Sequence, residues 1–168
     1  MNKLRNNRAR KIIFDAFVDL LMKKRFSNIT INDIANAAMI HRNTFYHHFK
    51  DKYDLLDQLF VATFPYERFK KNLNSFYDHP FKFLNFAYYG DVYRVLDEQR
   101  NDESFIDERN LMTFKLFVSK FHNSQVVWVL GKVYTIIIWC EYYKPEYTFR
   151  NAYKQLDHIY QTGKFPEI

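Results

Sequence analysis

The chain has 168 residues, of which 48% are hydrophobic and 20% aromatic, so it is long and apolar enough to fold around its own core. Three glycines and four prolines are too few for a turn-rich sandwich or barrel, and the single cysteine, Cys140, excludes an internal disulfide framework. Residues 1–53 hold 11 Lys and Arg against 4 Asp and Glu, whereas residues 54–168 hold 14 against 15. This asymmetry is typical of a nucleic-acid-binding module on a neutral body, although a basic solvated face would give the same balance.

The N-terminal third predicts helices joined by short links. Between residues 3 and 25, apolar side chains recur at three- and four-residue spacing, which predicts a helix with one buried stripe. Thr30 is suited to cap a second, short helix that runs to about Ala38. Asp33 stands three residues after Thr30, in the relation of a capping box.

A tight turn at residues 39–40 separates this helix from another short one. The second short helix would place Phe45 and Phe49 on its inner face, and Asp51 would cap the longer helix that follows, residues 51–64. Pro65 should end that helix. Two short helices with a sharp link between them, the second exposing polar side chains, are the helix-turn-helix arrangement.

The remaining two thirds predict only helices, so the fold class is all-α. The expected segments are about 80–100, 103–122, 124–143 and 146–162. The most apolar window, "VVWVLGKVYTIIIWC", is shorter than the roughly 20 residues of a membrane span and contains Lys132, so we expect a buried helix. No secretory signal is visible, and we expect a cytoplasmic protein.

The polar side chains of the second short helix have the chemistry of duplex recognition. Arg42 can pair with guanine and Asn43 with adenine in the major groove. Thr, Tyr, His and Lys side chains are suited to phosphates. A metal site at His41, His47 and His48 is disfavoured, because adjacent histidines on a helix diverge by about 100°. No nucleophile elbow or glycine-rich phosphate loop is present, so we expect no enzyme and no cofactor.

The runs "ITINDIANAA" and "RNTFYHHFKDKYDLL" resemble the TetR family of bacterial transcriptional regulators, in particular a subtype with a TFYxHFxDKYDL region. The resemblance implies a TetR-like all-α fold with an N-terminal three-helix helix-turn-helix DNA-binding domain, residues 1–52. A C-terminal helical bundle for dimerisation and effector binding, residues 53–168, would follow, with helix 51–64 connecting the two. The family usually has glycine at the turn where this chain has Met39, and often after the first helix where this chain has Arg25. A non-glycine residue in a left-handed turn conformation is strained, so we expect strain at Met39.

Carried over by position, the resemblance implies that Arg42 and Asn43 read base edges and that Asn32 reaches a base or a nearby phosphate. His47 would touch either a base or the sugar-phosphate chain. The residues expected to hold the DNA backbone are Thr30, Thr44, Tyr46, His48 and Lys52.

Two further sets of residues follow from the helices of the C-terminal part. The last two helices resemble the family's dimerisation pair, with the apolar positions Val126, Val127, Leu130, Val133, Tyr134, Ile137 and Ile138; burial inside one subunit is the alternative. Aromatic residues that could line an effector pocket are Phe86, Tyr89, Tyr93, Phe114 and Phe117; core packing is the alternative.

The sequence therefore predicts a homodimeric, sequence-specific regulator that binds a palindromic operator in double-stranded DNA, with repression as the default. A small-molecule effector on the C-terminal part would shift the spacing of the two heads through helix 51–64, and no membrane partner is expected. The alternative is a TetR-like helical adaptor or co-activator that works through protein partners or ligand binding with little DNA specificity.

Overall fold

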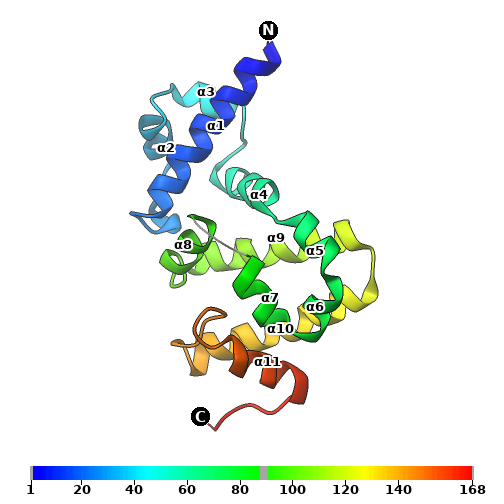
Figure 1. The fold of residues 1–168 in the computed structure, drawn as a ribbon. Coiled ribbons are helices and arrows are strands. Elements are labelled where there is room, and N and C mark those ends of the chain that lie inside the picture. The colour runs from blue at the N-terminus through cyan, green and yellow to red at the C-terminus, as the bar shows by residue number, and fades with distance from the viewer. Residues whose placement is uncertain (1, 88–90, 168) are drawn as a thin grey trace. The chain divides into compact units, whose positions relative to one another are not determined.

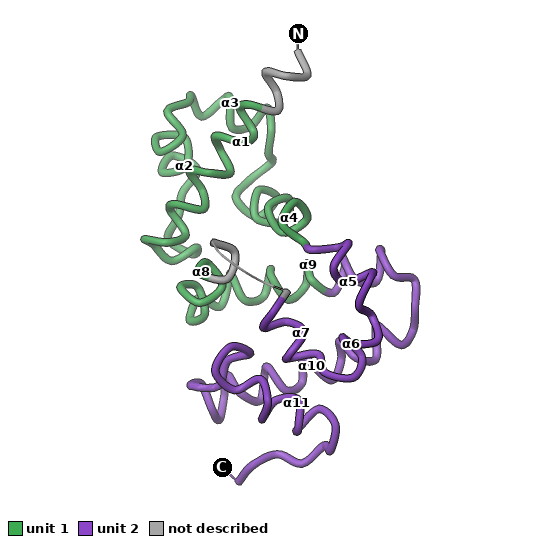
Figure 2. The backbone as a smooth tube through the Cα atoms, in the orientation of Figure 1, with its two compact units in different colours: residues 1–64, 90–113 green, residues 65–89, 114–168 purple. Residues whose placement is uncertain are grey.

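The computed structural model describes residues 2–87 and 91–167, and these residues form helices and no strand (Figure 1). They fall into two compact units (Figure 2). Unit 1 comprises Met1–Phe64 and Gly90–Thr113, and unit 2 comprises Pro65–Tyr89 and Phe114–Ile168. These units change at residue 64, at the end of the helix that was expected to connect the two domains, and a second segment of the chain belongs to the same unit as the N-terminal head.

Unit 1 contains the helices of the head. They are α1 (Asn2–Leu21), the 3-10 helix η1 (Phe26–Asn28), α2 (Ile31–Ala37), α3 (Arg42–Tyr46), α4 (Lys52–Thr63), α8 (Asp91–Glu98) and α9 (Glu103–Phe121) as far as Thr113. The predicted caps are confirmed: Thr30 and Asp33 form a reciprocal capping box, and the side chain of Asp51 accepts hydrogen bonds from the first turn of α4.

The core of unit 1 is built largely from phenylalanine. Phe17 and Phe26 meet edge to face at 6.2 Å, and Phe26 meets Phe105 at 6.1 Å. Val95 and Phe105, both from the second segment, are buried in the same cluster as the residues of α1 to α4. Residues 90–113 belong to the head because they complete its hydrophobic core.

Unit 2 contains the remaining helices. They are α5 (Tyr66–Lys71), α6 (Leu73–Asp78), α7 (Pro80–Ala87), the part of α9 that follows Thr113, α10 (Ser124–Tyr143) and α11 (Tyr153–Thr162). Asp157 of α11 fastens α7, because its carboxylate accepts hydrogen bonds from Phe81 N (2.9 Å) and Lys82 N (3.0 Å). A buried carboxylate thus satisfies donors at the start of α7 that the helix itself leaves unpaired.

Two predicted helices have different bounds in the structure. The segment 80–100 holds two helices, α7 and α8, and residues 88–90 are outside the described part. The last helix begins at Tyr153, later than predicted. Asn151 explains the delay, because its side chain bonds Thr148 N and Glu146 O and so holds the preceding residues in a turn.

By length and composition alone, α10 could cross a membrane. One side of the helix packs against α7 and α11 inside unit 2. The buried residues on that side are Val126, Val129, Leu130, Val133, Ile136 and Cys140. This packing accounts for the apolar residues on that side of the helix.

The turn between α2 and α3 carries backbone strain at Met39, whose φ is 51°. Met39 N donates to Asn36 O and Ile40 N donates to Ala35 O, which is the Schellman pattern that usually has glycine at its left-handed position. The Met39 side chain is 92% exposed, so no packing offsets the strain. Arg25, the other expected glycine position, has a φ of −58° and requires no glycine.

Replacing Met39 with glycine should therefore stabilise the protein by about 1 kcal/mol, because glycine adopts the left-handed conformation without a steric penalty. Urea unfolding followed by circular dichroism would measure this, with Met39→Ala as the control, since alanine keeps the Cβ and the strain. A Met39→Gly variant less stable than the wild type would show that the side chain itself stabilises the turn.

Candidate nucleic-acid interface

Two phenylalanines determine which side of α3 is exposed. Phe45 and Phe49, four residues apart, are buried in the core of unit 1, and α3 packs against α2. The backbone hydrogen bonds continue beyond the end of α3 as far as Phe49, whose N donates to Phe45 O. The side chains left exposed are Arg42, Asn43, Tyr46 and His47.

Arg42 and Tyr46 form a pair on this exposed side. Arg42 Nε and Nη2 donate to the Tyr46 hydroxyl at 3.3 and 2.9 Å, and the guanidinium lies 5.4 Å from the centre of the Tyr46 ring. These contacts restrict the long Arg42 side chain before any partner binds. Its Nη1 donors and the hydroxyl hydrogen of Tyr46 are not used in these bonds.

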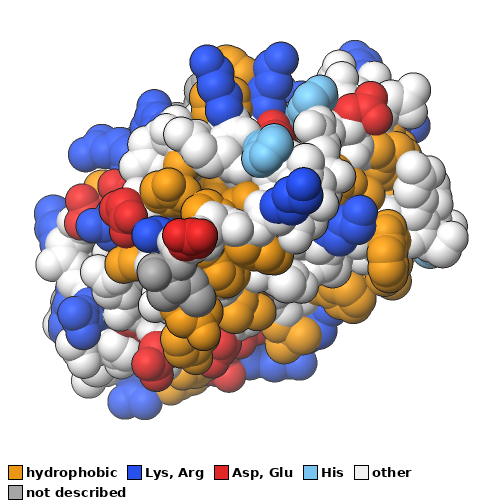
Figure 3. Space-filling view, turned by 90° about the horizontal axis from the view of Figure 1, so that it is seen from below, with side chains coloured by type: hydrophobic (Ala, Val, Ile, Leu, Met, Phe, Trp, Pro, Cys, Tyr) orange, Lys and Arg blue, Asp and Glu red, His pale blue; other side chains and the backbone are white. Residues whose placement is uncertain are grey.

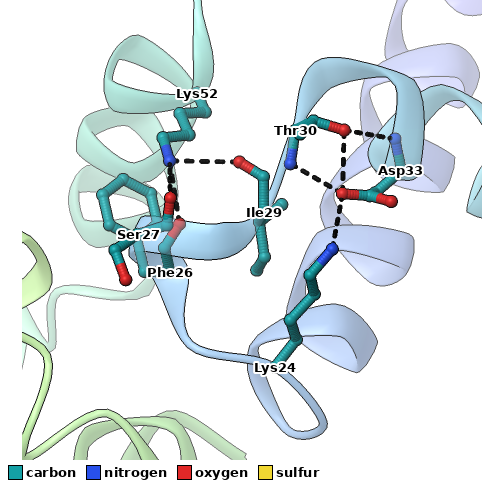
Figure 4. Close-up of polar contacts among 7 residues, drawn as sticks. All are labelled: Lys24, Phe26, Ser27, Ile29, Thr30, Asp33 and Lys52. Atoms are coloured by element: carbon teal, nitrogen blue, oxygen red, sulfur yellow. Dashed lines mark hydrogen bonds and ion pairs between the residues drawn. The ribbon is translucent and has the colours of Figure 1, made fainter.

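Thr30, Asp33 and Lys24 form a hydrogen-bond network at the start of α2 (Figure 4). Asp33 Oδ2 accepts from Lys24 Nζ, Thr30 N and Thr30 Oγ1, each at 2.8 Å. The hydrogen bond from Lys24 and those from Thr30 lower the pKa of Asp33 to about 2. The Thr30 hydroxyl also accepts from Asp33 N at 3.1 Å, so Thr30 is engaged in capping α2.

The other predicted contact residues vary in exposure. Asn32 is exposed in the first turn of α2, whereas Thr44 and His48 are partly buried. Burial, together with the charge of Arg10, lowers the pKa of His48, which disfavours its charged form. Within the described residues, His, Cys, Asp and Glu side chains form no group of three or more that could hold a metal.

Lys52 does not lie as the resemblance implies. Its Nζ donates to the carbonyl oxygens of Phe26 (2.9 Å), Ser27 (3.0 Å) and Ile29 (3.0 Å), as Figure 4 shows. An ammonium has three donors, and all three are used inside unit 1. The prediction that Lys52 holds a phosphate therefore does not fit this geometry, because the cation is occupied by the protein's own backbone.

Two buried polar residues in the same region were missed by the sequence analysis. Gln99 and Asp102, at the corner between α8 and α9, are 2% and 3% exposed. Gln99 Oε1 accepts from Phe26 N, and Asp102 Oδ2 accepts from Ser27 N, both at 2.8 Å. More than 70 residues separate them from these partners in the sequence, and no local motif announces such a contact.

The predicted effector pocket finds little support among the described residues. Phe117 is 1% exposed and packs against Phe69 (4.9 Å) and Phe121 (5.5 Å), so it belongs to the core of unit 2. Phe86 and Phe114 are exposed. The side chains of the other two pocket residues, Tyr89 and Tyr93, lie outside the described part. Core packing, the alternative interpretation, therefore describes Phe117.

The predicted dimer residues separate into three groups by their exposure. Val126, Leu130 and Val133 are buried within unit 2 and face its core, so they are corrected to core residues of the subunit. Tyr134 and Ile137 are partly buried. The exposed side of α10 carries Val127, Ile138 and three residues that the prediction omitted, Trp128, Gly131 and Tyr142.

Residues 13–59 match the model of the family described as "Bacterial regulatory proteins, tetR family", so the head carries a segment of this type. The HTH-type dhaKLM operon transcriptional activator DhaS of Lactococcus lactis is 38% identical over 56 residues, which cover 33% of this chain. The match spans 30% of that relative's length.

Two solved structures are similar over nearly the whole chain. NalD of Pseudomonas aeruginosa, the secondary repressor of the MexAB-OprM multidrug efflux pump, has a TM-score of 0.56 at 18% identity and covers 94% of this chain and 95% of its own. A second structure, native NalD, has a TM-score of 0.57 with coverage of 94% and 97%. At this identity the likeness establishes the fold alone, which is all-α and TetR-like as predicted.

The hydrogen bonds that Asp33 accepts should make the stability of the head dependent on pH in the acid range. Because the folded pKa lies below the ordinary 3.8, the stabilisation is complete above pH 4 and is lost as the pH falls towards 2. Urea unfolding at pH 5, 4, 3 and 2 should show the stability of the wild type approaching that of Asp33→Asn, which cannot titrate at this position. A constant difference between the two proteins would contradict the assigned pKa.

Proposed function

We propose that this chain, whose residues 13–59 match a TetR-type domain, is a sequence-specific DNA-binding regulator of transcription. The observation that carries the proposal is the exposure of Arg42, Asn43, Tyr46 and His47 on α3, beside two phenylalanines that are buried in the core. The excess positive charge of residues 1–53 supports it, because Lys and Arg supply the attraction to phosphates. The TFYxHFxDKYDL region supports placement in the corresponding subtype.

In this proposal α3 enters the major groove and Arg42 and Asn43 contact base edges. A guanidinium fits guanine O6 and N7, and a carboxamide fits adenine N6 and N7. Tyr46 holds Arg42 from one side and keeps its own O–H for a phosphate. The residues around them contact the sugar-phosphate backbone and fix the position of α3 along the duplex; they are Asn32, Thr44, His47 and His48. Thr30 acts by capping α2.

We propose further that the exposed side of α10 joins two copies of the chain. Trp128 is 69% exposed and Tyr142 is 80% exposed, which is costly for such large side chains in water. A Cβ built on Gly131 meets nothing within 4 Å, so no neighbour within the chain requires a glycine in the middle of this helix. A helix that approaches closely from a second copy would require it. Hydrophobic side chains also reach the surface among charged ones on the face drawn in Figure 3.

A dimer with two such heads binds a palindromic operator in double-stranded DNA, with half-sites about one helical turn apart or somewhat more. Repression by occluding the polymerase is the default, and the cytoplasm is the compartment where such a protein acts. An effector or partner bound to the C-terminal helices would release the DNA by changing the spacing of the heads. The rival proposal, a helical adaptor, predicts weak duplex binding with no preferred sequence.

Selection of bound fragments from random duplex DNA separates the two proposals. We expect the wild-type chain to enrich a palindrome, with affinity that falls steeply as the salt concentration rises. Replacing Arg42 with alanine should cost about 1–3 kcal/mol of preference for the correct base at one position of each half-site. Enrichment of no sequence by the wild type would favour the adaptor.

The Arg42–Tyr46 pair can be tested by a double-mutant cycle on the selected duplex. Tyr46→Phe removes the hydroxyl that holds Arg42, so we expect it to weaken discrimination at the base that Arg42 reads. We expect the effects of Tyr46→Phe and Arg42→Ala to be less than additive. Strictly additive effects would mean that Tyr46 contacts the DNA without positioning Arg42.

If the exposed side of α10 forms the dimer interface, a large charged side chain at Gly131 should disrupt the dimer. Gly131→Arg should convert a dimer to a monomer in sedimentation equilibrium, because the arginine would lie between the two α10 helices. Gln125→Arg adds the same charge to an exposed position on another side of α10 and should leave the dimer intact. If Gly131→Arg also stays dimeric, the interface lies elsewhere.

A further inference from the structure

The link between α1 and α2, residues 22–30, contains backbone groups that the helices cannot satisfy. None of it is α-helical, since its only helical part is the short 3-10 helix η1, and its residues Phe26 and Ile29 are buried. A buried N–H or C=O without a partner destabilises the fold by about 1–3 kcal/mol. The structure meets this demand with side chains from two other segments of unit 1.

Lys52, in the first turn of α4, satisfies the acceptors. Its ammonium bonds three carbonyls of the linker and lies 4.6 Å from the centre of the Phe26 ring (Figure 4). Burial lowers the pKa of Lys52, while the nearby negative charge of Asp102 raises it. Three backbone carbonyls thus bind the ammonium of Lys52, and the negative charge of the buried Asp102 favours its charged form.

Gln99 and Asp102 satisfy the donors. Gln99 accepts from Phe26 N and donates through Nε2 to Leu21 O and Lys24 O, so one amide joins the end of α1 to η1. Asp102 accepts from Ser27 N at 2.8 Å and, at the start of α9, from Phe105 N at 3.1 Å. Burial raises the pKa of Asp102, but these hydrogen bonds and the charge of Lys52 bring it below its ordinary value.

We propose that Lys52, Gln99 and Asp102, named here the linker clamp, are positioning residues for DNA binding that touch no DNA themselves. The linker leads directly into Thr30, the cap of α2, and α3 packs on α2. A shift of the linker therefore moves the whole reading unit. This inference rests on the proposed function and reassigns Lys52 from phosphate ligand to internal clamp.

The same geometry makes the α8–α9 corner a necessary part of the reading head. Its polar groups hold the linker, and Phe105 fills the core beneath it. A perturbation that moves residues 99–105 would reach α2 through hydrogen bonds to the linker backbone. That route is distinct from one along α4, although Lys52 joins α4 to the same linker.

The decisive experiment compares Lys52→Met with Lys23→Met on the duplex that the wild-type chain selects. Lys23 is exposed in the same linker, so its replacement controls for the loss of one positive charge. Each variant is first shown by circular dichroism to be folded, and its affinity is then measured between 50 and 200 mM salt. A lost phosphate contact reduces the slope of log K against log salt by about 0.9.

We expect Lys52→Met to lower affinity for the selected duplex by about tenfold and for a scrambled duplex by less, because α2 and α3 lose their position, with the same salt slope as Lys23→Met. A slope shallower than that of Lys23→Met by about one contact would restore Lys52 as a phosphate ligand. Unchanged affinity in a folded variant would reduce the clamp to a purely structural device. Both results presuppose that the wild type selects a duplex; a wild type that binds none contradicts the proposed function itself.

Gln99→Met provides a second test without any change of charge, and it carries the proposal if Lys52→Met does not fold. The substitution keeps the side-chain length and removes the bonds to Phe26 N, Leu21 O and Lys24 O. We expect an affinity loss of about tenfold at every salt concentration, with an unchanged slope. Wild-type affinity in folded Gln99→Met would overturn the positioning role of the corner.

Discussion

The burial of Phe45 and Phe49 is the constraint on which the proposed interface depends. Because side chains four residues apart share one side of a helix, two buried rings fix the rotation of α3 about its own axis. Arg42, Asn43, Tyr46 and His47 are exposed as a direct consequence. The polar side of the helix is thus set by the core, and the base-contacting role that we propose for it needs no further rearrangement of α3.

In the linker before α2, side chains from other segments of unit 1 provide hydrogen-bond partners for backbone N–H and C=O groups. Its carbonyls are bonded by a cation from α4, and its N–H groups are bonded by an amide and a carboxylate from the α8–α9 corner. Those partners come from segments far apart in the sequence, so the head is assembled from both ends of unit 1. The hydrophobic contribution of Val95 and Phe105 follows the same division.

Local sequence was sufficient where the determining contacts are local. The capping box of Thr30 and Asp33, the Asp51 cap and the inward placement of Phe45 and Phe49 involve residues within four positions of one another, and all are confirmed. For Lys52 the sequence could not decide, because a lysine at a helix start suits a phosphate and a set of carbonyls equally well. Only the tertiary fold, which brings η1 beside α4, decides between them.

Periodicity was insufficient in α10 for a related reason. It identified a helix that is apolar on more than one side, but it could not say that Val126, Leu130 and Val133 face the subunit's own core while Val127 and Ile138 remain exposed. No sequence pattern indicates that Gln99 and Asp102 are buried, because their hydrogen-bond partners are distant in the sequence. The sequence therefore predicts α3 and its buried residues well, and the contacts that hold the linker poorly.

The central claim is that α3 lies in the major groove, and methylation interference on the selected duplex tests it most directly. Guanine N7 is exposed only in that groove, and it is an acceptor for arginine. The account predicts that methylation of N7 at symmetric guanines in both half-sites prevents binding. Binding that is indifferent to N7 methylation throughout a guanine-containing site would contradict the account.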